Sequence, residues 1–140
     1  MSAPVPGLAA LPTQAAIRDA LLADVPLMDL ITGVFDWVEE KQPYPYIVVG
    51  EAMETPANSH DRFGSEVLET LHIWDQSRGF AQSLTIAARV IQALDHTPLT
   101  IVGHVHRWTR FVSQQTLRDP EPPGLRHVPM TFRIGTEVAP

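Results

Sequence analysis

Residues 80–94, FAQSLTIAARVIQAL, contain the clearest helical pattern in the chain. Gln82, Arg89 and Gln92 lie away from an apolar stripe whose members recur at spacings of three and four. The stripe consists of Phe80, Leu84, Ala87, Ala88, Ile91 and Leu94. Residues 95–98, DHTP, end the helix, because a residue before proline is disfavoured in helical geometry. The pattern therefore predicts one long amphipathic helix that packs its stripe on a sheet.

Strand-like sequences flank this helix on both sides. In residues 66–76, EVLETLHIWDQ, the period of two places Val67, Leu71 and Ile73 on one face and Leu68, His72 and Trp74 on the other. Residues 103–117 predict a third long strand, and residues 118–125 a proline-rich turn. Four apolar residues then alternate with other types in the cleanest strand period of the chain: Val128, Met130, Phe132 and Ile134. We expect this last strand to lay its apolar face on the long helix.

A proline–tyrosine sequence precedes another strand, in residues 39–51, EEKQPYPYIVVGE. Pro43 and Pro45 favour an extended entrance, and neither can donate a backbone hydrogen bond. The β-branched run that follows, residues 47–49, is typical of a strand covered on both faces. Residues 34–38 predict a short extended segment, and residues 55–65 a polar loop.

The N-terminal third predicts two short helices. Thr13 is a suitable cap for the first, which runs as far as Asp24, and Asp24 caps the second, with Pro26 in its first turn and Gly33 at its end. Residues 1–11 carry two prolines, one glycine and no charge, which favours a flexible or partner-ordered arm.

The order of these elements predicts a single α+β domain over residues 1–140. We expect a two-layer sandwich in which an antiparallel or mixed sheet of about four strands carries the long helix and the two short N-terminal helices on one face.

Composition excludes several classes of function. The net charge is −6, and no basic run is present, so strong nucleic-acid binding is not expected. There are no cysteines, which excludes disulfides, thiolate metal sites and a cysteine nucleophile. No secretory signal or membrane-spanning run is recognisable, so we expect a protein of cytosol-like conditions without a membrane partner.

Candidate chemistry is sparse. His104 and His106 share one face of a predicted strand and could both contact one metal ion, but no third ligand is marked. A small metal-binding domain therefore stays open as an alternative. Ser59, His60 and Asp61 are adjacent in sequence, whereas catalytic triads draw their members from separate elements. No glycine-rich phosphate motif occurs, so we expect neither an enzyme nor a cofactor.

The chain also carries three tryptophans, Trp37, Trp74 and Trp108, and an Arg107/Arg110 pair. Such residues are enriched where protein surfaces meet. An oligomer interface is favoured over a strip for single-stranded nucleic acid, because the net charge is negative.

The layout of residues 14–135 resembles the tail completion, or tail terminator, proteins of long-tailed bacteriophages, also called head-to-tail joining proteins. The resemblance rests on IRDALLADVPLMDLITGVFD, on the PYPYIVVGE entrance, on the strand, turn and helix from LHIWDQ onward, and on the final hairpin RFVSQQTLRDPEPPGLRHVPMTFRI. It implies a non-enzymatic subunit of a homohexameric ring that ends tail tube polymerisation and joins the tube to the head connector. DNA would pass through the lumen without specific binding, which suits the acidic charge.

The resemblance implies a virion protein at the head-proximal end of the tail, assembled in the host bacterial cytoplasm, with partners in the tail tube and the head–tail connector. It transfers no catalytic residue. Candidate contact segments are 43–46, 54–65 and 118–125, and the candidate interface residues are Tyr44, Tyr46, His60, Arg62, Phe63, Trp108, Arg110, Arg118, Glu121 and Arg126. A head-side connector or adaptor ring is the nearest alternative, and a gene transfer agent would use a similar part.

Overall fold

The computed structural model describes residues 5–118 and 124–140. The helices within them are α1 (Ala10–Leu22), α2 (Val25–Met28) and α3 (Ala81–Leu94). The strands are β1 (Val34–Phe35), β2 (Tyr46–Pro56), β3 (Gly64–Gln76), β4 (His104–Gln114), β5 (Leu117–Arg118) and β6 (Leu125–Val138). No helix among these residues is long and apolar enough to cross a membrane.

The strands form one mixed sheet in the order β1-β2-β3-β6-β4, with β5 pairing β6 beyond the end of β4. The β3–β6 ladder is antiparallel and runs from Gly64↔Glu137 to Gln76↔Leu125. β1 pairs β2 in parallel, and the other pairs are antiparallel. The α+β class is confirmed, but the sheet has six strands rather than about four. β1 lies at the start of the short extended segment expected at residues 34–38, whereas β5, of two residues, is too short to show a periodic pattern.

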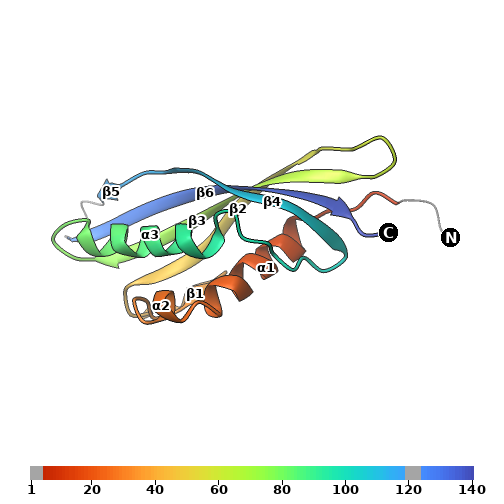
Figure 1. The fold of residues 1–140 in the computed structure, drawn as a ribbon. Coiled ribbons are helices and arrows are strands. Elements are labelled where there is room, and N and C mark those ends of the chain that lie inside the picture. The colour runs from red at the N-terminus through yellow and green to blue at the C-terminus, as the bar shows by residue number, and fades with distance from the viewer. Residues whose placement is uncertain (1–4, 119–123) are drawn as a thin grey trace.

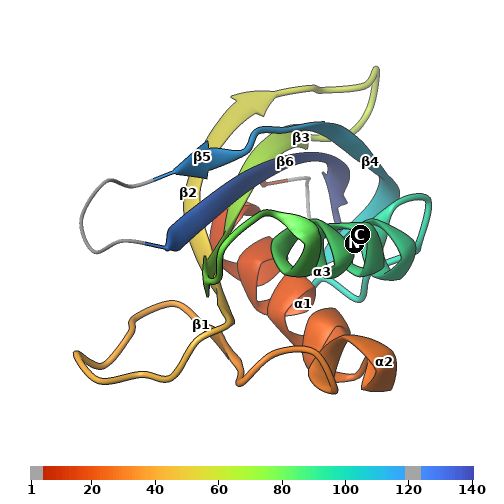
Figure 2. The same cartoon turned by 90° about the vertical axis from the view of Figure 1, so that its left-hand side faces the viewer.

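The sheet arches over the helices, which all lie on one of its faces (Figures 1 and 2). Between these layers sits a continuous apolar core that includes Ile17, Leu71, Val90, Phe132 and Ile134. The alternation in β6 is as the sequence predicts, since Val128, Met130, Phe132 and Ile134 are all fully buried. No helix or strand of the described residues covers the opposite face of the sheet, which we call the outer face (Figure 2).

The long helix is where the sequence places it, but its buried stripe is different. Ser83, Ile86, Ala87, Val90 and Leu94 face the sheet. Leu84, by contrast, is 38% exposed, and Ala88 is exposed as well. The predicted stripe was therefore wrong at residues 84 and 88. Apolar residues occupy two adjacent stripes of this helix, and periodicity alone cannot tell which one meets the sheet.

Helix α1 begins earlier than predicted, because its cap comes from a distant strand, and it ends at Leu22, before the predicted end at Asp24. The carboxylate of Glu54 in β2 accepts the backbone N–H of Ala9 at 2.9 Å and of Ala10 at 3.0 Å. Thr13 is inside the helix and buried, so its prediction as the cap was wrong. Residues 10 and 11, placed by the sequence in a flexible arm, form the start of α1. Residues 1–4 of that arm lie outside the described residues.

Helix α2 begins as predicted, since Asp24 Oδ2 accepts the N–H of Leu27 at 3.1 Å. It ends at Met28, earlier than the predicted stop at Gly33. The β2–β3 hairpin is longer than predicted, with pairing that continues to Pro56↔Ser65. Its loop is therefore residues 57–63 rather than 55–65, and the hairpin projects beyond the helices (Figure 1).

Candidate assembly surface

The outer face of the sheet carries a cluster of aromatic and polar side chains from three strands. Trp74 of β3 is directly opposite His127 of β6, and the two rings stack with centroids 4.0 Å apart at an angle of 5°. His127 also stacks on His72, with centroids 4.9 Å apart. We call His72, Trp74 and His127, together with Glu51, the outer-face cluster. Its three rings are half-buried although no helix or strand in the described part of the chain covers them, so they present flat apolar area beside polar atoms.

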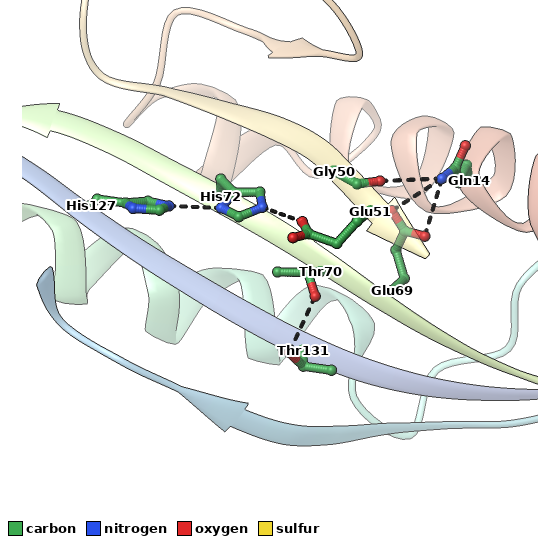
Figure 3. Close-up of polar contacts among 8 residues, drawn as sticks. All are labelled: Gln14, Gly50, Glu51, Glu69, Thr70, His72, His127 and Thr131. Atoms are coloured by element: carbon green, nitrogen blue, oxygen red, sulfur yellow. Dashed lines mark hydrogen bonds and ion pairs between the residues drawn. The ribbon is translucent and has the colours of Figure 1, made fainter. Parts of the chain in front are cut away.

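Hydrogen bonds connect the cluster in a row (Figure 3). His72 Nδ1 lies 2.7 Å from His127 Nε2, and His72 Nε2 lies 2.5 Å from Glu51 Oε1. The hydrogen bond from His72 lowers the pKa of the Glu51 carboxyl. With both nitrogens of His72 engaged, its ring is held in one orientation.

Gly50 makes room for this arrangement. A Cβ at position 50 would lie 2.5 Å from His72 Cδ2 and 3.0 Å from the carbonyl oxygen of Thr70. The pairing of β2 with β3 shifts register between Val49 and Ala52, so Gly50 and Glu51 form a bulge. Bulges redirect side chains, and this one accompanies the contact of Glu51 with His72 on the outer face.

A buried carboxyl lies on β3, on the face opposite to His72 and Trp74. Glu69 of β3 is fully buried against α1, and the amide nitrogen of Gln14 is 3.4 and 3.3 Å from its two carboxyl oxygens (Figure 3). Burial raises the pKa of Glu69 to about 8, against the effect of the Gln14 hydrogen bond. Glu69 is therefore mostly protonated at neutral pH. It joins α1 to the sheet through the side chain of Gln14.

Tyr44 and Tyr46 extend the aromatic surface towards β1. Their rings stack with centroids 5.3 Å apart, and Tyr46 also meets Phe35 edge to face at 6.1 Å. The Tyr44–Pro45 peptide bond is cis. Tyr46 pairs with Trp74 across the β2–β3 ladder, so the tyrosines continue the outer-face cluster. Burial, followed by the effect of Tyr44, raises the pKa of Tyr46.

The other candidate residues are spread over the molecule. His60 and Arg62 are exposed in the hairpin loop, and Phe63 beside them is half-buried. Trp108 lies over Gly135 on the outer face, with the guanidinium of Arg133 5.2 Å from its ring. Arg110 follows on β4, and its Nη1 donates to the carbonyl of Thr109 at 2.9 Å.

The candidates around the last turn divide into two kinds. Arg118 is exposed on β5, and Glu121 lies outside the described residues. Arg126 is only 6% exposed, and its Nη2 donates to the carbonyl of Arg78 at 2.5 Å. Its guanidinium also stands 5.2 Å from the Phe80 ring. Arg126 therefore packs inside the subunit, so it offers little surface to a partner.

The two histidines of the metal hypothesis do not form part of a ligand set. His104 Nδ1 is 3.1 Å from the carbonyl oxygen of Val102, and His106 Nε2 is 2.6 Å from Thr109 Oγ1. Burial, followed by the positive charge of Arg110, lowers the pKa of His106. Within residues 5–118 and 124–140, no group of three or more His, Asp or Glu side chains is arranged to hold a metal ion.

Known proteins with similar sequences indicate which family this fold belongs to. The family described as Tail completion protein gp17 matches residues 15–137. The chain belongs to the tail completion protein family. The tail completion protein gp17 of Bacillus phage SPP1 is 30% identical over 112 residues, which cover 80% of this chain and 83% of that protein.

Solved structures agree with membership of the tail completion family. A chain in the virion of a native gene transfer agent particle has a TM-score of 0.84 at 25% identity, covering 92% of this chain and 97% of that one. The structure of bacteriophage SPP1 gp17 has a TM-score of 0.54 at 25% identity, covering 91% and 94%. The resemblance found in the sequence is thus confirmed. As a tail completion protein the chain is a structural virion component and not an enzyme.

Sequence reasoning missed most of the outer-face cluster. It placed His72 and Trp74 on one strand face, but nothing in the sequence indicated that His127 and Glu51 would join them. The alternation in residues 66–76 and 125–138 shows which residues share a face. Only the β3–β6 register brings position 74 opposite position 127.

Proposed function

We propose that this tail completion protein forms a homohexameric ring at the head-proximal end of the tail tube. The ring ends tube polymerisation and presents a joining surface to the head connector. The observation that carries this proposal is the match to a chain of a gene transfer agent virion, which covers 97% of that chain at a TM-score of 0.84. The subunit is assembled in the host cytoplasm and remains in the particle.

The outer face supports an assembly role. Tyr44 is 37% exposed, and Tyr46, Trp74 and Trp108 are half-buried on a sheet face that no helix of residues 5–118 and 124–140 covers. Tyrosine and tryptophan are enriched at the centres of protein interfaces, since they bury large area with few rotatable bonds. We assign this face, with Arg110 at its β4 edge, to contacts with neighbouring subunits. His60, Arg62 and Phe63 in the projecting hairpin loop are candidate contacts for the tube.

Charge supports the passage of DNA through such a ring. The net charge of each subunit is −6, so six subunits would surround the lumen with an excess of carboxylates. A protein that binds DNA tightly instead neutralises phosphates with lysine and arginine. The ring would therefore let DNA slide through its lumen without specific contacts.

Two measurements test this function. Light scattering and negative-stain microscopy of the purified protein should show rings of about six subunits, and a stable monomer would overturn the proposal. When the protein is added to polymerising tube subunits, the mean tube length should fall as the protein concentration rises. Unchanged tube length in the presence of rings would instead assign the chain to the connector or adaptor.

A matched pair of variants tests the surface. Trp74→Ala removes the ring that stacks on His127, and we expect it to weaken ring formation. Trp37→Ala removes a tryptophan that is 73% exposed in the segment before β2 and should leave ring formation unchanged. Circular dichroism of both variants checks that the subunits are folded. If folded Trp74→Ala protein assembles like the wild type, the outer face is not the subunit interface.

A further inference from the structure

An apolar groove runs between α2 and α3 on the side of α3 that does not face the sheet. Its apolar walls are formed by Pro26 and Leu30 from the α2 region and by Ala81, Leu84 and Ala88 from α3, and Thr85, Arg89 and Gln92 of α3 add polar atoms. Leu30 is 37% exposed and Leu84 is 38% exposed. The fold does not need this second apolar stripe, because α3 already packs on the core through Ile86, Val90 and Leu94. A partner that covers this stripe would remove its apolar surface from water.

The groove is held in shape by an ion pair at its edge. Asp24, the cap of α2, receives hydrogen bonds from Nε and Nη2 of Arg89 on α3, at 2.7 and 2.6 Å. This two-point contact fixes α2 against α3. The groove therefore exists before any partner binds, which reduces the entropy cost of occupying it.

The chain also carries an apolar segment that stays exposed to solvent although it runs beside the β2–β3 hairpin. Residues 5–8, VPGL, precede α1 without regular structure, and Val5 and Leu8 are 64% and 78% exposed. No charged residue occurs before Arg18. Glu54 holds the N–H groups of Ala9 and Ala10, so the segment leaves the subunit at a fixed point.

The segment and the groove lie at opposite ends of the subunit. Figure 1 shows the chain entering α1 at the end where the C-terminus lies, whereas α2 and the start of α3 are at the other end. Residues 5–8 therefore cannot fold back into the groove of their own subunit. Two different patches that match each other generate head-to-tail contacts, and such contacts close into a ring when the rotation permits.

We propose that residues 5–8 of one subunit occupy the α2–α3 groove of the next subunit. Four extended residues span about 14 Å. The groove follows α3 from Ala81 to Gln92, a rise of about 17 Å, so four extended residues fit within its length. Val5 and Leu8 then lie against Leu84 and Leu30. This inference rests on the proposed ring and specifies one of its contacts.

Disulfide trapping tests the contact directly, because the wild-type chain has no cysteine. Leu8→Cys and Leu84→Cys combined in one chain should give, under mild oxidation, a ladder of covalent multimers up to the size of the ring. Chains with either single substitution, when co-expressed, should give a covalent dimer as the largest product. Trp37→Cys combined with Leu84→Cys is the control, since Trp37 is 73% exposed and belongs to neither proposed contact. No ladder should form with that pair.

A charge exchange gives a second readout. Leu8→Asp and Leu84→Lys should each shift the protein towards monomer in light scattering, and the combined variant should recover at least part of the ring. Both positions are exposed, so circular dichroism should show that the variant monomers keep the wild-type secondary structure. Wild-type rings without a ladder from the Leu8/Leu84 cysteine pair would overturn the arm contact and leave the ring standing. A wild-type monomer would overturn both.

Discussion

Asp24 stabilises two helices at once, because its carboxylate caps α2 and binds Arg89 of α3. Oδ2 accepts the N–H of Leu27 at 3.1 Å and Nε of Arg89 at 2.7 Å, while Oδ1 accepts Nη2 of Arg89 at 2.6 Å. The hydrogen bond from Arg89 lowers the pKa of Asp24. A single side chain thus joins the cap of a four-residue helix to the longest helix of the described chain.

We expect Asp24→Ala to destabilise the subunit more than Asp24→Asn. Alanine removes the cap, a loss of about 1 kcal/mol, together with the ion pair. Asparagine can still cap but carries no charge. Urea unfolding of the three proteins measures the difference. Asp29→Ala, at an exposed carboxylate just after α2, is the control and should have little effect.

The same pair predicts a pH dependence. Because the folded-state pKa of Asp24 is lowered, its contribution to stability is present above the unfolded value of 3.8 and is lost as the pH falls through the folded value. The stability difference between wild type and Asp24→Asn should therefore shrink in acid. A difference that stays constant from pH 6 to the acid limb would contradict the assignment.

Glu69 predicts a pH dependence of the opposite sign. Its folded-state pKa is raised to about 8 from 4.5, so the folded protein holds a proton that the unfolded chain releases. The contribution of Glu69 to the free energy of unfolding should be highest below about pH 4.5. It should fall between about pH 4.5 and about pH 8 and stay constant at higher pH. The slope for one such group is about 1.4 kcal/mol per pH unit.

Glu69→Gln should remove this slope, since an amide of nearly the same shape stays neutral at every pH. Unfolding by urea at pH 5, 7 and 8.5 measures it, and the variant should be more stable than the wild type at pH 8.5. Glu66→Gln, on the outer side of the same strand, is the matched control and should keep the wild-type slope. An unchanged slope in Glu69→Gln would place its folded-state pKa in the ordinary range.

Glu54 should control the start of α1. Its carboxylate satisfies two N–H groups at the positive end of the helix, where negative charge is favourable. We expect Glu54→Ala to cost about 1 kcal/mol and to speed hydrogen exchange over residues 9–13. Glu40→Ala, in the exposed turn before β2, should change neither quantity. Unaltered exchange in Glu54→Ala would mean that the helix start does not depend on this carboxylate.

Gly50→Ala should destabilise the subunit, because the added methyl group meets both the His72 ring and the carbonyl oxygen of Thr70. Overpacking of this kind costs about 1 to 3 kcal/mol. It should also separate His72 from Glu51, which NMR titration of the His72 ring would detect. Gly79→Ala is a matched control, since nothing lies within 4 Å of a Cβ there. Equal stability of the two variants would contradict the close approach at Gly50.

Much of the local structure could be predicted from the sequence. The helix at 81–94, the apolar face of β6 and the Asp24 cap all depend on neighbours within a few residues, and local patterns record such interactions directly. The start of α1 could not be predicted in this way. Its cap is the carboxylate of Glu54 in strand β2, which lies 44 residues after Ala10 in the sequence, and no local signal marks so distant a partner.

The sequence by itself determined the class of protein: an α+β domain without cysteines, acidic, and similar in layout to the tail completion family. Only the tertiary structure decided which stripe of α3 is buried, why Glu69 holds a proton, and how His72, Trp74 and His127 meet. The reason is physical. Backbone periodicity fixes which residues share a face of one element, whereas strand register and helix placement, set by packing across the whole chain, fix which faces meet.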